Sequence, residues 1–275
     1  MALTLSSTLT LNNGVEMPRF GLGVFRTEVG AETENAVAWA LDAGYRAIDT
    51  AAAYGNEAEV GKSVRASGIP REQIFVTSKV ATGDLSYEKT KAAFETSMEK
   101  LGLDYIDLYL IHWPVNDWQG AWRALVEIYQ RGGLKAIGVS NFLQHHLEEL
   151  FSISDVVPAA NQIEYHPYLQ QPDLIAFCKQ HNIAVTAWAP IMKGRVMDVP
   201  TLIEIGKKYG KSPVHVTLRW MLQTDIITIP KSARRERIID NANVFDFELS
   251  AEDIAAINAL DKGERIGPHP DRIGK

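Results

Sequence analysis

Short apolar runs alternate with amphipathic stretches along most of this chain. Runs typical of buried strands occupy 20–24, 47–49, 75–79, 106–112, 136–140, 160–163, 184–188 and 226–229. Helical periodicity marks 31–42, 57–66, 88–101, 121–130, 145–151, 171–181 and 199–222, the last with an interruption at Gly210. Eight alternations without a change in composition predict one α/β domain over 1–275, a (β/α)8 TIM barrel. An open doubly wound sheet usually has fewer strands.

Both ends of the chain carry additional elements. Apolar alternations around Asn13-Gly14 predict an N-terminal β-hairpin, because Asn-Gly is the strongest short-range hairpin signal. Ser250 as an N-cap, with Glu252 and Asp253 in the first turn, predicts a C-terminal helix over 250–260. The Gly- and Pro-rich tail 263–275 is expected to be a loop that folds over the barrel mouth.

Composition and charge argue against several classes of partner. The 275 residues carry a formal net charge of −6 and a sequence pI near 5.7, so no overall basic field attracts nucleic acid or an anionic membrane. The single cysteine, Cys178, rules out an internal disulfide and a cysteine-rich metal frame. The first 13 residues lack the basic and apolar regions of a signal peptide, so a cytoplasmic location is the default expectation.

Four residues of complementary chemistry follow three of the predicted strands. Asp49 ends one strand and Tyr54 lies in the loop beyond it, Lys79 ends the next strand, and His112 ends the one after that. All strand C-termini of such a barrel lie on one face, where loops carry the active site. We therefore expect Asp49, Tyr54, Lys79 and His112 to form one site.

These four side chains suit the reduction of a carbonyl group. A tyrosine with an ordinary pKa of about 10 is a poor proton donor unless a cation such as the Lys79 ammonium stabilises its phenolate. Asp49 would keep a buried Lys79 charged, and His112 would orient the carbonyl oxygen while Tyr54 protonates it. No side chain among them carries a hydride, so a cofactor is required.

The strand ends further along the chain offer groups for that cofactor. Gly21 and Gly23 do not form a Rossmann fingerprint, because Arg26 occupies the third glycine position and no helix starts directly after it. Ser140, Asn141 and Gln162 supply a hydroxyl and two amides that could bind a nicotinamide carboxamide. Trp188 supplies an indole that could stack on the nicotinamide ring. A hydroxyl and four cations within 231–237 suggest a binding site for the 2′-phosphate of NADPH, which NADH lacks.

We expect no metal site. His145 and His146 occupy adjacent positions on a predicted helix and so do not share a face. The remaining histidines, including His166 and His269, have no partner at a ligand spacing. A solvated helix face is the alternative interpretation of the arginine cluster, and Arg235 is the member that we assign to it.

At these residues the chain resembles the aldo-keto reductase family, from about residue 9 to residue 270. The matching motifs are GYRAIDTA at 44–51 with Tyr54, SK at 78–79, LIHWP at 110–114, GVSNF at 138–142, NQIE at 161–164 and IPKS at 229–232. The chain is most similar to the prokaryotic branch that contains 2,5-diketo-gluconate reductases and glyoxal or methylglyoxal reductases. From this resemblance we expect the protein to be a bacterial enzyme and a monomer.

The resemblance implies a role for each matched residue. It implies Asp49, Tyr54, Lys79 and His112 as the catalytic tetrad, with Tyr54 as general acid in the NADPH-dependent reduction of small carbonyl substrates. NADPH would lie extended across the barrel mouth. The cofactor-binding residues implied are Ser140, Asn141 and Gln162 at the carboxamide, Trp188 at the nicotinamide ring, Lys231, Ser232 and Arg237 at the 2′-phosphate with Arg234 assisting, and Asn241 at the adenine.

One departure from the family pattern concerns the substrate pocket. The family commonly has a tryptophan two residues after the catalytic lysine, whereas this chain has Ala81. Phe25 and Trp113 remain as apolar walls, which predicts a wider pocket that accepts bulky ketones or aldehydes. A second class of function also stays open, because fold alone does not settle activity: a non-catalytic, NADPH-binding regulatory subunit on the same barrel.

Overall fold

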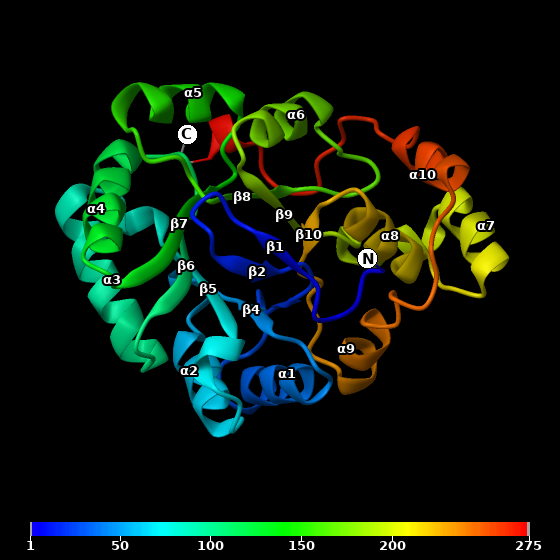
Figure 1. The fold of residues 1–275 in the computed structure, drawn as a ribbon, viewed down its shortest axis with the longest axis horizontal. Helices are drawn as coiled ribbons and strands as arrows, with labels where there is room; N and C mark the ends of the chain where they lie inside the picture. Colours follow the sequence, from blue (N-terminus) through cyan, green and yellow to red (C-terminus); the bar gives the residue numbers. More distant parts are fainter. Residues whose placement is uncertain (1, 274–275) are drawn as a thin grey trace.

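The computed structural model describes residues 2–273, and a parallel eight-stranded sheet lies at its centre (Figure 1). Its strand order is β10-β9-β8-β7-β6-β5-β4-β3, so every strand pairs with its neighbour in the chain. The strands are β3 (Leu22–Gly23), β4 (Ala47–Asp49), β5 (Phe75–Val80), β6 (Ile106–Ile111), β7 (Leu134–Ser140), β8 (Ala160–Glu164), β9 (Ala184–Trp188) and β10 (Ile227–Thr228).

Backbone contacts between the first and last strands close this sheet into a barrel. The Gly21 N–H donates to Thr228 O at 3.0 Å, and the Thr228 N–H donates to Arg19 O at 3.1 Å. A Cβ at Gly23 would lie 2.9 Å from Ile229 O, so this glycine permits the close approach of the two strands. The barrel prediction is confirmed, and the glycines that superficially suggested a dinucleotide motif lie at its seam.

Helices surround the sheet (Figure 1). They are α1 (Ala31–Asp42), α2 (Glu57–Ala66), α3 (Tyr87–Leu101), α4 (Trp118–Gln130), α5 (Gln144–Ile153), α6 (Pro172–Gln180), α7 (Pro200–Tyr209), α8 (Pro213–Gln223), α9 (Arg235–Asn241) and α10 (Ala251–Asn258). Gly210 adopts φ 65° and ends α7, while Ser212 caps α8 through its hydroxyl, so the interruption predicted at Gly210 separates two helices. Ser250 caps α10 in the same way.

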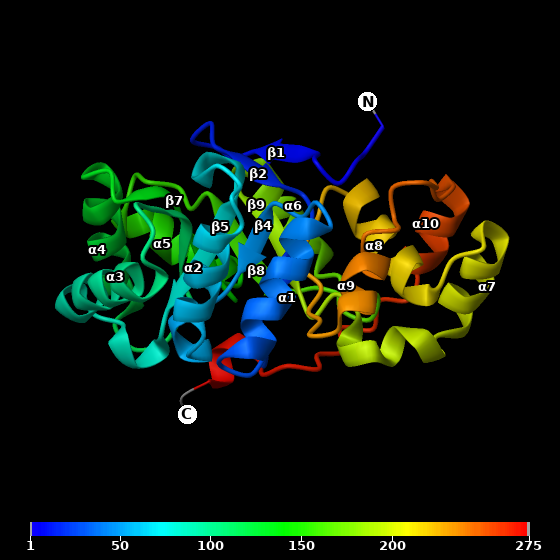
Figure 2. The same cartoon turned by 90° about the horizontal axis from the view of Figure 1, so that it is seen from below.

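An N-terminal hairpin of β1 (Thr8–Thr10) and β2 (Glu16–Pro18) lies across one end of the barrel (Figure 2). Its apolar residues Leu11 and Met17 are buried in the same cluster as Ala47, Phe75 and other side chains of the barrel strands. The hairpin predicted around Asn13-Gly14 is therefore confirmed, and it covers the barrel floor.

The C-terminal tail crosses the opposite end of the barrel (Figure 2). It includes a short 3-10 helix, η5 (Pro270–Arg272), which the sequence did not predict. The prediction of a tail over the mouth is confirmed for 263–273, whereas Gly274 and Lys275 lie outside the described residues. Within residues 2–273, none of the helices combines the length and the apolar character needed to cross a membrane.

Candidate active site

The four predicted catalytic residues meet at the C-terminal ends of β4, β5 and β6. Asp49 ends β4, Tyr54 ends the short 3-10 helix η1 (Ala52–Tyr54), Lys79 lies near the end of β5, and His112 directly follows β6. Lys79 Nζ is 2.7 Å from Asp49 Oδ1 and 3.4 Å from Tyr54 Oη. The Tyr54 and His112 rings meet edge to face, with centroids 5.8 Å apart.

A buried ion pair forms the base of the site. The side chain of Lys79 is fully buried and donates to Asp49 Oδ1 and, at 2.8 Å, to Thr50 O. Burial alone would lower the pKa of Lys79, but the neighbouring Asp49 and Tyr54 raise it above its ordinary value. Lys79 is therefore an ammonium throughout the physiological pH range.

Gln162 contributes to this ion pair, a role that the sequence did not reveal. Its Nε2 donates to Asp49 Oδ2 at 2.7 Å, so both carboxylate oxygens of Asp49 have partners. The sequence predicts that Gln162 binds the carboxamide of the cofactor. In the structure its side chain binds Asp49. Strand pairing alone could not have indicated this contact, because β8 and β4 lie on different sides of the barrel sheet.

The phenol of Tyr54 is held in its protonated form. Burial raises its pKa, the Lys79 ammonium lowers it by a smaller amount, and Asp49 raises it again, which leaves the pKa above its ordinary value. Lys79 thus acts in the predicted direction, but its effect is smaller than that of burial. A neutral phenol beside an ammonium retains the proton that a general acid must donate.

His112 is a neutral imidazole. Burial lowers its pKa to about 3, and the nearby positive charge of Lys79 contributes to the shift. A neutral imidazole can offer one N–H donor to an oxygen without carrying a charge. This state fits the predicted role of His112, which is to orient a carbonyl oxygen.

The predicted nicotinamide residues lie together on the adjoining part of the rim. Asn141, with φ 64°, directly follows β7, and its Nδ2 donates to His112 O at 3.0 Å. The Trp188 Nε1–H donates to Asn141 Oδ1 at 2.7 Å, and the Ser140 hydroxyl donates to Gln162 O at 2.8 Å. The structure therefore links the carboxamide-binding candidates both to one another and to the catalytic group.

The basic cluster after β10 has both exposed and buried members. Lys231, Arg234 and Arg237 are exposed, and none of them forms an ion pair with a described residue. Ser232 is buried and accepts from the Arg234 N–H at 3.1 Å. Asn241 is buried at the end of α9.

Arg235 is the remaining cation of the cluster. It lines a cavity of about 360 Å³ whose other walls include Trp39 and Asp42 of α1 and Ile239 of α9. The sequence had assigned Arg235 to a solvated helix face, and it is exposed as expected.

Two aromatic side chains that we expect to line the substrate pocket lie against Tyr54 and His112. Phe25 is 50% exposed, and its ring centroid is 4.9 Å from that of Tyr54. Trp113 stacks on His112 with centroids 6.4 Å apart and approaches Trp188 at 6.5 Å.

Ala81 lines a cavity of about 280 Å³ between η1 and α3. Ala52 and Glu57 contribute to the same cavity, but none of the four catalytic candidates does. This cavity is therefore bounded mainly by α3 and not by the catalytic side chains.

The structure changes our view of the adjacent histidines. His145 Nε2 and His146 Nε2 each lie 3.2 Å from Asp271 Oδ1, because η5 brings Asp271 to the start of α5. Neighbouring helix positions do not share a face, but Asp271, a third residue from the tail, reaches both rings. The His146 Nδ1 accepts from the Leu143 N–H at 3.1 Å, so the neutral ring carries its proton on Nε2, the atom that a metal ion would need. The ligand atoms of His145, His146 and Asp271 lie within 4.8 Å of one another, but a proton on His146 Nε2 argues against metal binding there.

Comparison with known proteins agrees with this fold. The pattern of the Aldo/keto reductase family matches residues 20–262. The chain therefore belongs to the aldo/keto reductase family and is an oxidoreductase.

Individual relatives resemble it along their full length. The chain is 54% identical to an uncharacterized oxidoreductase of Bacillus subtilis, YtbE, and 52% identical to the glyoxal reductase of the same organism, with 99% of each chain covered in both cases. A Bombyx mori aldo-keto reductase, crystallised in complex with NADP, superimposes with a TM-score of 0.91 at 37% identity and covers 98% of this chain and 97% of its own.

Proposed function

We propose that this protein reduces aldehydes and ketones to alcohols with NADPH as the hydride donor. The observation that carries the proposal is the convergence of Tyr54 Oη and Lys79 Nζ at 3.4 Å, with Lys79 paired to Asp49 and the neutral His112 beside the phenol. The family and the glyoxal reductase relative support this assignment.

Each catalytic side chain has a task in the reduction. The His112 N–H donates to the carbonyl oxygen and fixes its direction, and Tyr54 transfers its phenolic proton to that oxygen as negative charge develops there. The Lys79 ammonium stabilises the phenolate that results, and Asp49 keeps Lys79 charged. NADPH, when bound, supplies the hydride that reaches the carbonyl carbon, so one carbonyl is reduced and one NADPH oxidised per turnover.

The residues along the rim fit this cofactor. Amide groups of Asn141 and Gln162 lie next to the catalytic side chains, and Trp188 presents a partly buried indole there. Lys231, Arg234 and Arg237 are exposed cations without acidic partners among the described residues, which suits a phosphate group. The Bombyx mori relative was crystallised with NADP, which supports the same choice.

We further propose α-dicarbonyls such as methylglyoxal and keto sugar acids such as 2,5-diketo-gluconate as substrates. The name of the glyoxal reductase relative supports the first class. The small side chain of Ala81, at a position where the family commonly has tryptophan, and the aromatic walls Phe25 and Trp113 support an additional tolerance for bulky ketones.

The direct test follows NADPH absorbance with methylglyoxal, a 2,5-diketo sugar acid and a bulky aryl ketone. We expect wild-type protein to oxidise NADPH, and Tyr54→Phe to lose roughly 10²- to 10⁴-fold in kcat, because the general acid is gone while the ring remains. NADH serves as the cofactor control. Turnover that survives Tyr54→Phe would contradict the role of Tyr54, and NADPH binding without turnover of any carbonyl would favour the regulatory subunit.

Cofactor choice can be tested with two neighbouring arginines. We expect Arg237→Ala to raise the Kd for NADPH roughly 10-fold or more and to leave that for NADH nearly unchanged, because a charge-assisted bond to the 2′-phosphate is lost. Arg235→Ala is the matched control, since Arg235 lines the cavity next to α1. Equal effects of the two substitutions, measured by titration calorimetry, would argue against a 2′-phosphate site at Arg237.

The width of the pocket can be tested at position 81. We expect Ala81→Trp to lower kcat/KM for the bulky aryl ketone about 10-fold or more, because the indole takes up space that a large substrate needs. The value for methylglyoxal should stay within about 2-fold, since a small substrate does not reach that space. The wider pocket would be contradicted if wild type reduced the aryl ketone poorly and Ala81→Trp did not lower kcat/KM for it further.

A further inference from the structure

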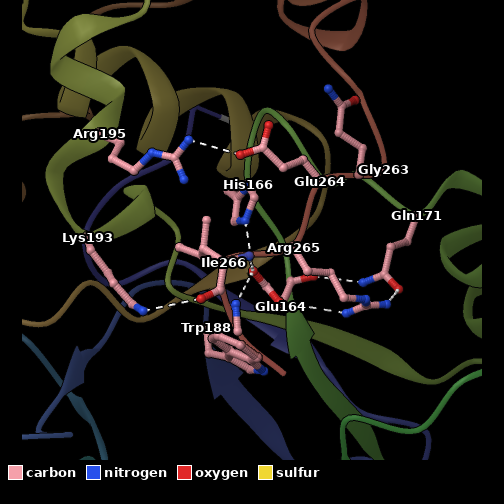
Figure 3. A network of polar contacts seen from close by, with 12 residues as sticks. Glu164, His166, Gln171, Trp188, Lys193, Arg195, Gly263, Glu264, Arg265 and Ile266 are labelled. Carbon is pink, nitrogen blue, oxygen red and sulfur yellow. Dashed lines mark hydrogen bonds and ion pairs between the residues drawn. The ribbon is translucent and has the colours of Figure 1, made fainter. Parts of the chain in front are cut away.

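The C-terminal segment 264–267, which we call the strap, is attached to the barrel wall close to Trp188 (Figure 3). The backbone N–H groups of Ile266 and Gly267 both donate to Glu164 Oε1, at 2.6 and 3.1 Å. Glu164 is fully buried and ends β8, and it pairs in register with Trp188 of β9. The Glu164 carboxylate therefore connects the tail to β8, directly beside the Trp188 position on β9.

Glu164 is charged in spite of its burial. Burial would raise the pKa of its carboxyl group, but hydrogen bonds with His166 Nε2 and from the two strap N–H groups outweigh this and hold the pKa below its ordinary value. The Arg265 guanidinium adds a positive charge 3.7 Å from Oε2. Backbone donors bind a carboxylate more strongly than a neutral oxygen, so the strap has a firm attachment.

The strap in turn limits the position of Trp188. A Cβ at Gly267 would lie 2.3 Å from Trp188 Cη2 and 3.1 Å from Cζ3, so the glycine backbone packs against the outer corner of the indole. The opposite end of the ring is fixed by the bond from Nε1 to Asn141 Oδ1. Trp188 is thus held at both ends, by a predicted cofactor residue and by the strap.

The strap has other attachments as well. The Glu264 N–H donates to Tyr168 O at 3.0 Å, and Arg265 Nη2 donates to Gln171 Oε1 at 2.9 Å (Figure 3). Arg195 pairs with Glu264 at 2.9 Å, but both side chains are about half exposed, and such pairs contribute little. Lys193 Nζ donates to Ile266 O at 3.3 Å from an exposed position (Figure 3). Among these attachments, Glu164 is the one that binds the N–H of Gly267 itself.

We propose that Glu164 is a positioning residue of the reductase site: through the strap, it fixes the Trp188 indole at the place where the nicotinamide ring of the cofactor stacks. This inference rests on the proposed function. Glu164 acts only through Gly267 and Trp188, and its effect falls first on cofactor affinity. It contacts none of the four catalytic side chains by a hydrogen bond or ion pair.

The test compares Gly267→Ala, Glu164→Gln and Gly83→Ala in the full-length protein. Gly267→Ala places a methyl group 2.3 Å from Trp188 Cη2 and, less tightly, 3.2 Å from Glu164 Oε2. Glu164→Gln removes the charge that holds the strap. Gly83 is the matched control, because a Cβ there meets nothing within 4 Å and its φ is not in the left-handed region. The readout is the Kd for NADPH by titration calorimetry, which needs no turnover.

We expect Gly267→Ala and Glu164→Gln each to raise this Kd about 5-fold or more, and Gly83→Ala to leave it unchanged. In a Trp188→Ala background, Gly267→Ala should add less than about 2-fold, because the displaced side chain is absent. A merely structural role for the strap would give the same effect in both backgrounds.

An unchanged Kd in Glu164→Gln or in Gly267→Ala, or an equal rise for Gly267→Ala with and without Trp188, overturns the proposal. If Glu164→Gln fails to fold, the Gly267→Ala comparison decides alone. A wild type that binds NADPH but reduces no carbonyl contradicts the reductase and leaves the strap result valid, whereas a wild type that binds no NADPH overturns both.

Discussion

The contact between the Lys79 ammonium and the Asp49 carboxylate is the interaction on which the site depends. A fully buried ammonium is stable only with a close partner, and removal of one member of such a pair costs about 3–5 kcal/mol because a charge is left uncompensated. Gln162 and the Thr50 carbonyl complete the shell of the pair. Charged groups from β4 and β5 and an amide from β8 are thereby held together inside the mouth of the barrel.

That buried charge determines the properties of its neighbours. It contributes to the low pKa of His112 and partly offsets the effect of burial on Tyr54. The outcome is one permanent cation, one neutral phenol and one neutral imidazole around a single space. Proton donation to an oxygen is the chemistry that such a set supports.

The two ends of the barrel have different tasks. The N-terminal hairpin adds Leu11 and Met17 to the apolar interior and closes the floor. The opposite end carries the polar side chains and is crossed by the tail, which Glu164 and Asp271 attach to β8 and α5. Stability is thus concentrated at one end and chemistry at the other, as expected for this fold.

Local patterns in the sequence predicted the elements well. The bounds of β4, β9, α1 and α2 agree with the predicted ranges, because apolar periodicity and capping residues act over short distances. The four catalytic candidates were identified because barrel topology brings strand ends together.

Contacts between distant segments were not predictable in this way. The bond from Gln162 to Asp49, the attachment of the strap to Glu164 and the meeting of His145 and His146 with Asp271 all join segments more than 100 residues apart. They depend on the final packing. The balance of burial and charge at Tyr54 also depends on depth within the site, which a sequence pattern does not give.

The central claim is that Tyr54 and His112 are both neutral and that the Tyr54 proton is the one transferred. The most direct measurement is the pH dependence of the single-turnover rate constant for carbonyl reduction by NADPH. A general acid is active below its pKa, so the account predicts a rate that is flat through the neutral range and falls only as the pH rises past about 10. An inflection near pH 6 to 7, where an unperturbed histidine titrates, or a fall centred near pH 7 to 8 would contradict it.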